Sequence, residues 1–150
     1  MTTPVAFNHL GQCVTDLARS RRFYEEVLGF TFWYEATPPD DPSATLLRID
    51  APGLTACYLV RDGLVLELLH FGAGHQPARE RVVNDPGLTH LSLSVPGLDA
   101  TCALVVEHGG EVVADTNIGA AVFVRDPDGQ LVELLPIAYR ASLPPLPATD

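Results

Sequence analysis

The chain has 150 residues, of which 47% are hydrophobic, enough for one compact domain or for two small halves that share a core. Its formal net charge is −10 and it contains no lysine, which argues against binding to nucleic acid or to an anionic membrane. No apolar run approaches the length of a membrane helix, the start lacks a signal-peptide pattern, and three cysteines without CxxC spacing indicate reduced thiols. These features predict a soluble protein of the cytoplasm.

The first elements in chain order are a strand and a helix. Residues 6–14 predict a strand with His9, Gly11 and Cys13 on one face. Asp16 is a typical helix N-cap, and an apolar stripe at helical spacing runs to about residue 28. Gly29 is the expected end of this helix, in a left-handed conformation.

The rest of the first half predicts mainly strands. Residues 30–36 are rich in aromatic residues and predict a strand, and 37–43 predict a loop rich in turn residues. Residues 44–53 fit either a short strand or one helical turn. Residues 55–60 and 64–71 predict a hairpin closed by an Asp-Gly turn.

The pattern then restarts. Residues 73–87 lack periodicity and predict a linker between two modules, about 5–72 and 88–137. A C-terminal tail follows at 138–150, and its proline-rich part, 141–150, is expected to pack loosely or to be disordered. In the second module we expect strands at 87–95, 111–114, 120–125 and 130–137, and a helix at 99–108 that ends at two glycines.

Four residues stand out because they lie within apolar strands: His9, Glu67, His90 and Glu133. Removing one ion from water costs several kcal/mol unless something compensates it, and two neighbouring carboxylates would repel each other. A divalent cation resolves both problems, with the histidines as nitrogen ligands and the glutamates as oxygen ligands.

An internal repeat strengthens this interpretation. A shift of 81 positions without a gap places His9 on His90 and Gly29 on Gly110, and LELL aligns with VELL so that Glu67 matches Glu133. Each half therefore predicts a βαβββ module with a histidine on its first strand and a glutamate on its last. The first half is longer by 15 residues, which we expect within residues 37–54.

Four segments carry a resemblance to a known family: HLGQCVTDLARSRRFYEEVLGF, LVLELL, LTHLSLSV and RDPDGQLVELL. They resemble the vicinal oxygen chelate superfamily, which includes glyoxalase I, methylmalonyl-CoA epimerase, extradiol dioxygenases, and fosfomycin- and bleomycin-resistance proteins. The resemblance implies an α+β fold in which two βαβββ modules form a cupped, partly open mixed β-barrel, as a single domain of residues 1–150.

The resemblance also implies a function. His9, Glu67, His90 and Glu133 fall on the family's metal-ligand positions, and this set is most similar to bacterial-type glyoxalase I. The implied activity is that of a metal-dependent lyase or isomerase that removes a proton next to a metal-bound carbonyl and stabilises an enediolate. Glu133 would be the base and Glu67 its partner carboxylate, with Ni, Co, Zn, Mn or Fe(II) as the metal.

Other functions remain open at this point. The alternatives are an isomerase similar to methylmalonyl-CoA epimerase, an Fe(II) extradiol-type dioxygenase, and a non-catalytic drug-binding or resistance protein. The resemblance implies a small-molecule substrate with vicinal oxygens and a homodimer. It identifies neither the substrate nor a thiol cofactor, nor whether the site lies within one chain or across a dimer.

Several other side chains are weaker candidates for the site. Those considered for contact with a substrate are His70, His75, Cys13, Tyr58, Trp33, Phe123 and Arg125. His108 lies near a helix end, where it would interact favourably with the helix dipole. Gln12 faces the helix side of its strand, where its amide must find a partner.

Overall fold

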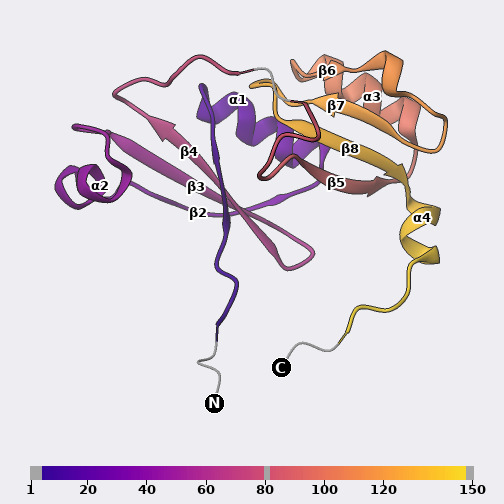
Figure 1. Cartoon of the computed structure of the whole chain (residues 1–150), viewed down its shortest axis with the longest axis horizontal. Helices are drawn as coiled ribbons and strands as arrows, with labels where there is room; N and C mark the ends of the chain where they lie inside the picture. The colour runs from indigo at the N-terminus through magenta and orange to yellow at the C-terminus, as the bar shows by residue number, and fades with distance from the viewer. Residues whose placement is uncertain (1–4, 80–81, 148–150) are drawn as a thin grey trace. The chain divides into compact units, whose positions relative to one another are not determined.

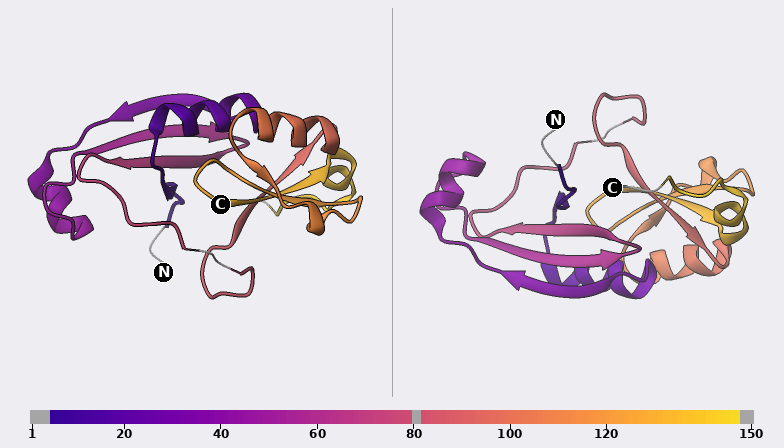
Figure 2. Two further views of the ribbon diagram at one scale, coloured as in Figure 1. Left: turned by 90° about the horizontal axis from the view of Figure 1, so that it is seen from above. Right: turned by 90° about the horizontal axis from the view of Figure 1, so that it is seen from below.

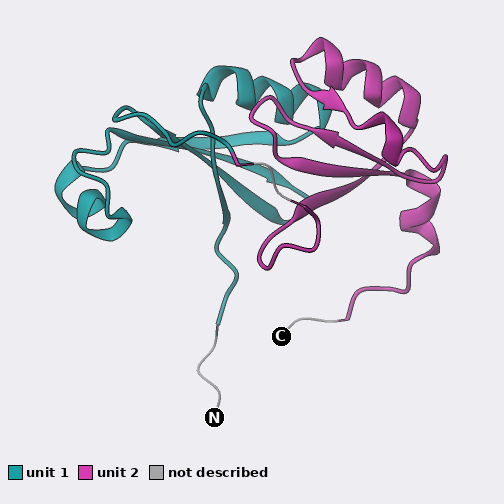
Figure 3. Cartoon of the chain, turned by 45° about the horizontal axis from the view of Figure 1, so that its top comes forward, with its two compact units in different colours: residues 1–78 teal, residues 79–150 magenta. Residues whose placement is uncertain are grey.

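A computed structural model describes residues 5–79 and 82–147 of the chain. The chain divides into two compact units, Met1–Ala78 and Arg79–Asp150 (Figure 3). Each unit contains one four-stranded sheet, and we describe each by itself.

The first unit is a mixed sheet with helices (Figure 1). The sheet order is β1-β4-β3-β2, with β1 parallel to β4 and the other neighbours antiparallel. In chain order the elements are β1 (Leu10–Cys13), α1 (Leu17–Arg22), the π-helical turn η1 (Phe23–Val27), β2 (Thr31–Ala36), α2 (Asp40–Leu47), β3 (Leu54–Arg61) and β4 (Leu64–Phe71).

The core of the first unit lies between α1, η1 and one face of the sheet (Figure 2). Phe23 and Tyr24 of η1 are fully buried, as are Leu59, Leu66 and Leu68 of the sheet. Alternation along the strands places the other set of side chains, which includes Glu67, on the opposite face. We call this opposite face the open face of the sheet.

The ends of the first helix agree with the sequence. Asp16 caps α1 by accepting a hydrogen bond from the backbone N–H of Arg19 at 3.0 Å. Gly29 follows the helical segment with φ +68°, as expected. The π-helical turn was not expected, and it also accounts for Gln12, whose side-chain oxygen accepts a hydrogen bond from the Tyr24 hydroxyl at 2.8 Å.

The region 37–53 differs from its prediction as a loop and a short strand or single turn. It contains α2, which begins at Asp40, and this helix accommodates the extra length of the first half. Asp40 and Asp41 lie in its first turn, where carboxylates interact favourably with the helix dipole and where Pro42 is tolerated. Pro39 and Pro42 therefore mark the start of a helix and not a loop, with Pro39 as the N-cap residue.

The second unit repeats the arrangement, with sheet order β5-β8-β7-β6 and β5 parallel to β8. Helix α3 packs against β6, β7 and β8. In chain order the elements are β5 (His90–Val95), α3 (Leu98–Glu107), β6 (Glu111–Val112), the 3₁₀ turn η2 (Ala114–Thr116), β7 (Val122–Arg125), β8 (Leu131–Pro136) and α4 (Ile137–Ser142).

Further boundaries differ from the sequence prediction. In the second unit β5 begins at His90 and not at 87, β7 begins at Val122 and not at 120, and β6 ends at Val112, ahead of the turn η2, instead of at 114. The first strand is shorter than 6–14, because β1 pairs with β4 only from Leu10 onward, and His9 directly precedes it. The C-terminal tail begins as α4, which contacts β5 and β8 and extends to Ser142, two residues into the part expected to pack loosely. Residues 148–150 of that tail lie outside the described residues.

The α+β class and the two βαβββ modules are confirmed, with α2 as an addition to the first module. In the part of the chain that the structure describes, no helix is long and apolar enough to cross a membrane.

Candidate metal centre

In the first unit, His9 and Glu67 meet at the open face of the sheet. Glu67 lies in the middle of β4, opposite Gly11 of β1 and Tyr58 of β3. His9 precedes β1, and its Nε2 lies 3.0 Å from Glu67 Oε2. The register of β1 against β4 therefore brings together two residues that are far apart in sequence.

Glu67 is held on both of its oxygens. The Tyr58 hydroxyl donates a hydrogen bond to Oε1 at 2.5 Å, while His9 contacts Oε2. Glu67 is only 8% exposed, so these contacts compensate most of its lost hydration. Burial, together with the hydrogen bond to Glu67, raises the pKa of Tyr58 well above its usual range, so the phenol stays a donor.

In the second unit, His90 and Glu133 occupy the corresponding positions. His90 Nε2 lies 3.8 Å from Glu133 Oε2, and the same oxygen accepts a hydrogen bond from the Ser92 hydroxyl at 2.7 Å. Phe123 of β7 lies opposite Glu133, as Tyr58 lies opposite Glu67. Since phenylalanine has no hydroxyl, Ser92 on the other neighbouring strand is the hydroxyl donor here.

The two histidines are oriented in the same way. His9 Nδ1 lies 2.6 Å from the Asn8 side-chain oxygen, and His90 Nδ1 lies 2.8 Å from the Thr89 hydroxyl. Each ring also makes an edge contact with the opposing aromatic residue, with centroids 5.8 Å apart for His9 and Tyr58 and 5.2 Å for His90 and Phe123. Asn8 and Thr89 are themselves 81 positions apart, so the repeat extends to the residues that orient the rings.

This geometry suits a metal ligand. When the Nδ1–H group donates a hydrogen bond to the preceding side chain, Nε2 carries no proton and its lone pair is directed toward the carboxylate. Two donor atoms that bind one ion at about 2.1 Å and at right angles lie about 3 Å apart. The separation of 3.0 Å in the first unit matches that value, and 3.8 Å in the second unit is somewhat longer.

The structure brings the predicted ligands together as two pairs. Within the described residues, no group of three or more His, Cys, Asp or Glu side chains is close enough to hold a metal ion. Each unit by itself therefore offers one imidazole and one carboxylate.

The sequence missed Asn8, Thr89 and Ser92 as partners of the predicted ligands. Their signal was available only in part: the repeat aligns Asn8 with Thr89, but their role depends on side-chain orientation. Ser92 lies two residues after His90 on β5, and its contact with Glu133 follows from the parallel register of β5 and β8.

The weaker candidates fall in different places. Cys13 is exposed on the open face, two residues beyond Gly11. His70 lies within β4, and alternation places it on the face opposite to Glu67; His75 is exposed in the following loop. His108 caps α3, with Nδ1 2.9 Å from the Leu104 carbonyl oxygen, as expected near a helix end.

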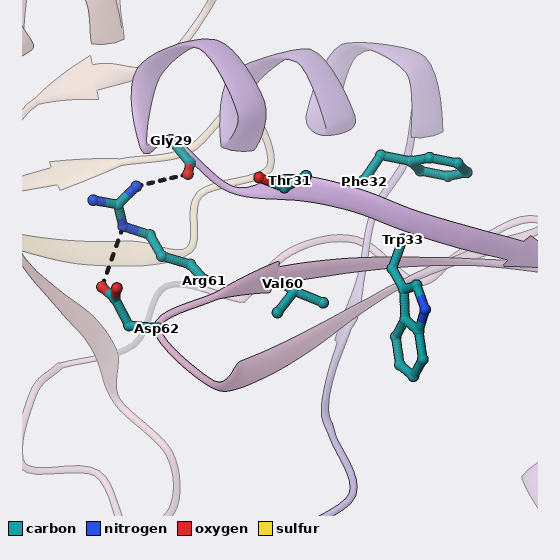
Figure 4. Close-up of a pocket in the computed structure, with 7 residues that line it drawn as sticks. All are labelled: Gly29, Thr31, Phe32, Trp33, Val60, Arg61 and Asp62. Carbon is teal, nitrogen blue, oxygen red and sulfur yellow. Dashed lines mark hydrogen bonds and ion pairs between the residues drawn. The ribbon is translucent and has the colours of Figure 1, made fainter.

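Of the remaining candidates, Trp33 lines a pocket in the first unit (Figure 4). Arg125 shares a face with Phe123, but its guanidinium donates to the Gly129 carbonyl at 3.2 Å and so supports the β7–β8 turn.

Comparison with solved structures finds similar folds over most of the chain. Glyoxalase I from Leishmania major, described as trypanothione-dependent, is 25% identical, with a TM-score of 0.65 over 89% of this chain and 87% of that one. A glyoxalase family protein from Bacillus cereus is 18% identical, with a TM-score of 0.73 over 89% of this chain and 94% of that one. The fosfomycin resistance protein FosX from Listeria monocytogenes, solved with Mn(II) and sulfate, is 14% identical, with a TM-score of 0.59 over 89% and 93% of the two chains.

None of the curated proteins compared matches the chain. The family model of the Glyoxalase/Bleomycin resistance protein/Dioxygenase superfamily matches residues 6–134, which include both histidine–glutamate pairs. The chain belongs to this superfamily.

Proposed function

We propose that this protein is a divalent-metal-dependent lyase or isomerase of the glyoxalase I type, with His9, Glu67, His90 and Glu133 as the metal ligands. The observation that carries the proposal is the repeated pair: in both units an imidazole Nε2 faces a carboxylate oxygen, and the other ring nitrogen is held by the preceding side chain. The similarity to a glyoxalase I at 25% identity supports it, whereas the likeness to FosX at 14% bears on the fold alone.

The two carboxylates differ in a way that supports different roles. Both oxygens of Glu67 are engaged, and the residue is buried. Glu133 makes both of its contacts through Oε2, and its side chain is 27% exposed. Glu67 is therefore suited to a fixed ligand, and Glu133 to a base that exchanges a proton with a substrate.

The proposed reaction needs no external oxidant or reductant. Glu133 takes the proton from the thiohemiacetal carbon next to the carbonyl and returns it to the former carbonyl carbon, while the hydroxyl proton of the thiohemiacetal carbon passes to the former carbonyl oxygen; the product is the isomeric 2-hydroxy thioester. A bound divalent cation supplies Lewis acidity that lowers the cost of negative charge developing on the substrate oxygens. Ser92, through its hydrogen bond to Oε2, orients Glu133 for the transfer.

The test is the Glu133→Gln variant, assayed with thiohemiacetals in the presence of Ni, Co, Zn, Mn or Fe(II). Removing a general base typically lowers the rate by about 10²–10⁴-fold, and we expect a loss in this range. Exchange of the substrate C–H hydrogen with D₂O, followed by NMR, should be lost in parallel. His70→Ala is the control, because His70 lies on the other face of β4 and should leave both readouts unchanged.

The same assay distinguishes the alternatives. Turnover of an acyl-CoA without turnover of thiohemiacetals would replace the proposal by an epimerase. Oxygen consumption with Fe(II) and a catechol would replace it by a dioxygenase. If no metal binds to protein purified without chelator, the enzyme proposals all fail and a binding protein remains.

The assembly is also a proposal. By the family resemblance we expect a homodimer that acts on a small molecule with vicinal oxygens. In the proposed centre one ion is held by two histidine–glutamate pairs, and these two pairs belong either to one chain or to two copies of the chain. Sedimentation velocity across a range of protein concentrations tests the dimer.

A further inference from the structure

A row of aromatic rings extends from Glu67 across the open face of the first unit. The Tyr58 hydroxyl contacts Glu67, and the Tyr58 ring stacks on Tyr34 with centroids 4.3 Å apart and planes 11° from parallel. The Tyr34 ring in turn meets Trp33 edge-on at 4.8 Å. We call Tyr58, Tyr34 and Trp33 the aromatic row.

A β-bulge directs Trp33 toward this row. The register of β2 against β3 shifts between Phe32 and Tyr34, so the alternation of side chains is broken at Trp33. Phe32 lies on the helix side, where the Arg21 guanidinium sits 3.9 Å from its ring centroid. Trp33 and Tyr34 are 60% and 39% exposed, and bulges that re-aim exposed aromatic residues are common next to binding sites.

A pocket of about 470 Å³ adjoins the end of the row (Figure 4). Trp33, Thr31 and Val60 contribute to its lining, and in Figure 4 the Trp33 and Val60 side chains point to the same side of the strands. Val60 follows Tyr58 by two residues on β3, so both belong to the open face.

The one cationic side chain of this pocket lining is already engaged. Arg61 donates to the Gly29 carbonyl at 2.6 Å and lies 3.6 Å from the Asp62 carboxylate. With its charge balanced in this way, the pocket offers aromatic and aliphatic surface with the Thr31 hydroxyl, and it favours an uncharged occupant.

The second unit does not repeat the aromatic row. Phe123 corresponds to Tyr58, but the adjacent edge strand β6 has only two residues. The residue beside Phe123 is Val113, whose backbone N–H donates to the Phe123 carbonyl, so an aliphatic side chain stands where the first unit has Tyr34. The histidine–glutamate pair is thus common to both units, whereas the aromatic row belongs to the first unit alone among the described residues.

We propose that the aromatic row and its pocket bind a flat, uncharged, apolar body of the substrate whose vicinal oxygens are held at the Glu67 end. Glu67 on β4 and Tyr34 on β2 are two strand spacings apart, about 10 Å. The ligand class is therefore a vicinal-oxygen head joined by a chain of about that length to an aromatic ring. This inference rests on the proposed function, since that function places the oxygens near Glu67.

Trp33 is the one tryptophan of the chain, so its fluorescence reports directly on this site. The probe is ω-phenylpentanohydroxamate, which presents two vicinal oxygens and a terminal ring, and the matched probe without a ring is pentanohydroxamate. In the Zn-loaded protein we expect the phenyl probe to change the Trp33 emission and to bind about tenfold more tightly than the ringless probe. A cyclohexyl analogue separates the effect of a flat ring from that of apolar area.

Calorimetry on variants completes the test. Trp33→Leu should abolish the preference for the phenyl probe without changing Zn affinity, and Tyr139→Leu, which removes an exposed aromatic residue of α4, should leave the preference intact. Equal binding of the two probes by the wild type, or an unchanged preference in Trp33→Leu, would overturn the inference while the metal chemistry stands. Loss of Zn binding in the wild type would instead count against the proposed function.

A second copy of the chain is the other possible occupant of this surface. If it covers Trp33, the emission should depend on protein concentration and not on the probe, with a matching change in sedimentation. That result would also overturn the inference.

Discussion

Glu67 and Glu133 show how equivalent residues of a repeat acquire different surroundings. Each lies in an apolar strand, opposite an aromatic residue and next to a histidine. The difference comes from one oxygen atom: Tyr58 carries a hydroxyl that occupies Glu67 Oε1, and Phe123 does not. Ser92 acts on the other side of Glu133 and leaves Oε1 without a described hydrogen bond.

Tyr58→Phe should therefore loosen the hold on Glu67 in the His9–Glu67 pair, while the ring at position 58 keeps its contacts with His9 and Tyr34. We expect a loss of about 1–3 kcal/mol in the free energy of unfolding, because a buried carboxylate loses its donor. Metal affinity should fall by about 10–100-fold, as for other residues that orient a ligand. Denaturant unfolding and calorimetry measure the two effects, and Tyr139→Phe is the control at an exposed tyrosine. Unchanged affinity would contradict a role for Tyr58 in holding Glu67.

Cys57 provides a second prediction at this scale, on pH. Burial raises the pKa of its thiol from 9.0 to about 11, and the residue is fully buried. Above pH 9 the unfolded chain loses the Cys57 thiol proton while the folded chain keeps it. The contribution of this thiol to the free energy of unfolding is therefore fully present below pH 9. It should be lost as the pH rises from 9 to about 11, by up to about 3 kcal/mol.

Chemical denaturation at several pH values measures this loss. The difference in unfolding free energy between wild type and Cys57→Ala should shrink across that range and stay constant below it. The exposed Cys13 should react with a thiol reagent in the native state, whereas Cys57 should react only after unfolding. A pH-independent difference would show that the thiol is not desolvated.

At the scale of elements, the turn after η1 depends on Gly29. Its φ of +68° disfavours side chains, and a Cβ built there would overlap the Arg61 guanidinium that donates to the Gly29 carbonyl. The link between the helical segment and the end of β3 therefore favours glycine, since a side chain at this position would displace the Arg61 guanidinium.

Gly29→Ala should destabilise the protein by about 1–3 kcal/mol, through both the positive φ and the displaced Arg61. Gly63→Ala is the matched control, because Gly63 has φ +82° but nothing within 4 Å of a Cβ. It should cost about 1 kcal/mol from the backbone term alone. Equal effects of the two substitutions in thermal unfolding would mean that the contact with Arg61 contributes nothing.

At the scale of the whole molecule, the proposed centre takes one histidine from each unit. If one ion binds both pairs, His9→Ala and His90→Ala should each lower the affinity for that same ion, whereas two separate ions would leave one intact site in each single variant. The stoichiometry should be one ion for every two pairs, measured by calorimetry and elemental analysis. Two ions per chain, one of them unaffected in each single variant, would contradict the shared centre.

Much of this molecule was predictable from local patterns. The α+β class, the two modules, the Asp16 cap and the end of the helix at Gly29 follow from periodicity, capping chemistry and turn residues, which act within a few positions of the chain. The histidine–glutamate pairs were predictable because a charged residue inside an apolar strand needs a partner, and the repeat showed the same need twice.

Other features were decided by tertiary structure alone. The hydroxyl of Tyr58 reaches Glu67, and Ser92 reaches Glu133, only because strand registers set them side by side. The bulge at Trp33 depends on how β2 pairs with β3. The physical reason is the same in each case: local patterns determine which face a residue occupies, but the pairing of distant strands determines which residue it meets there.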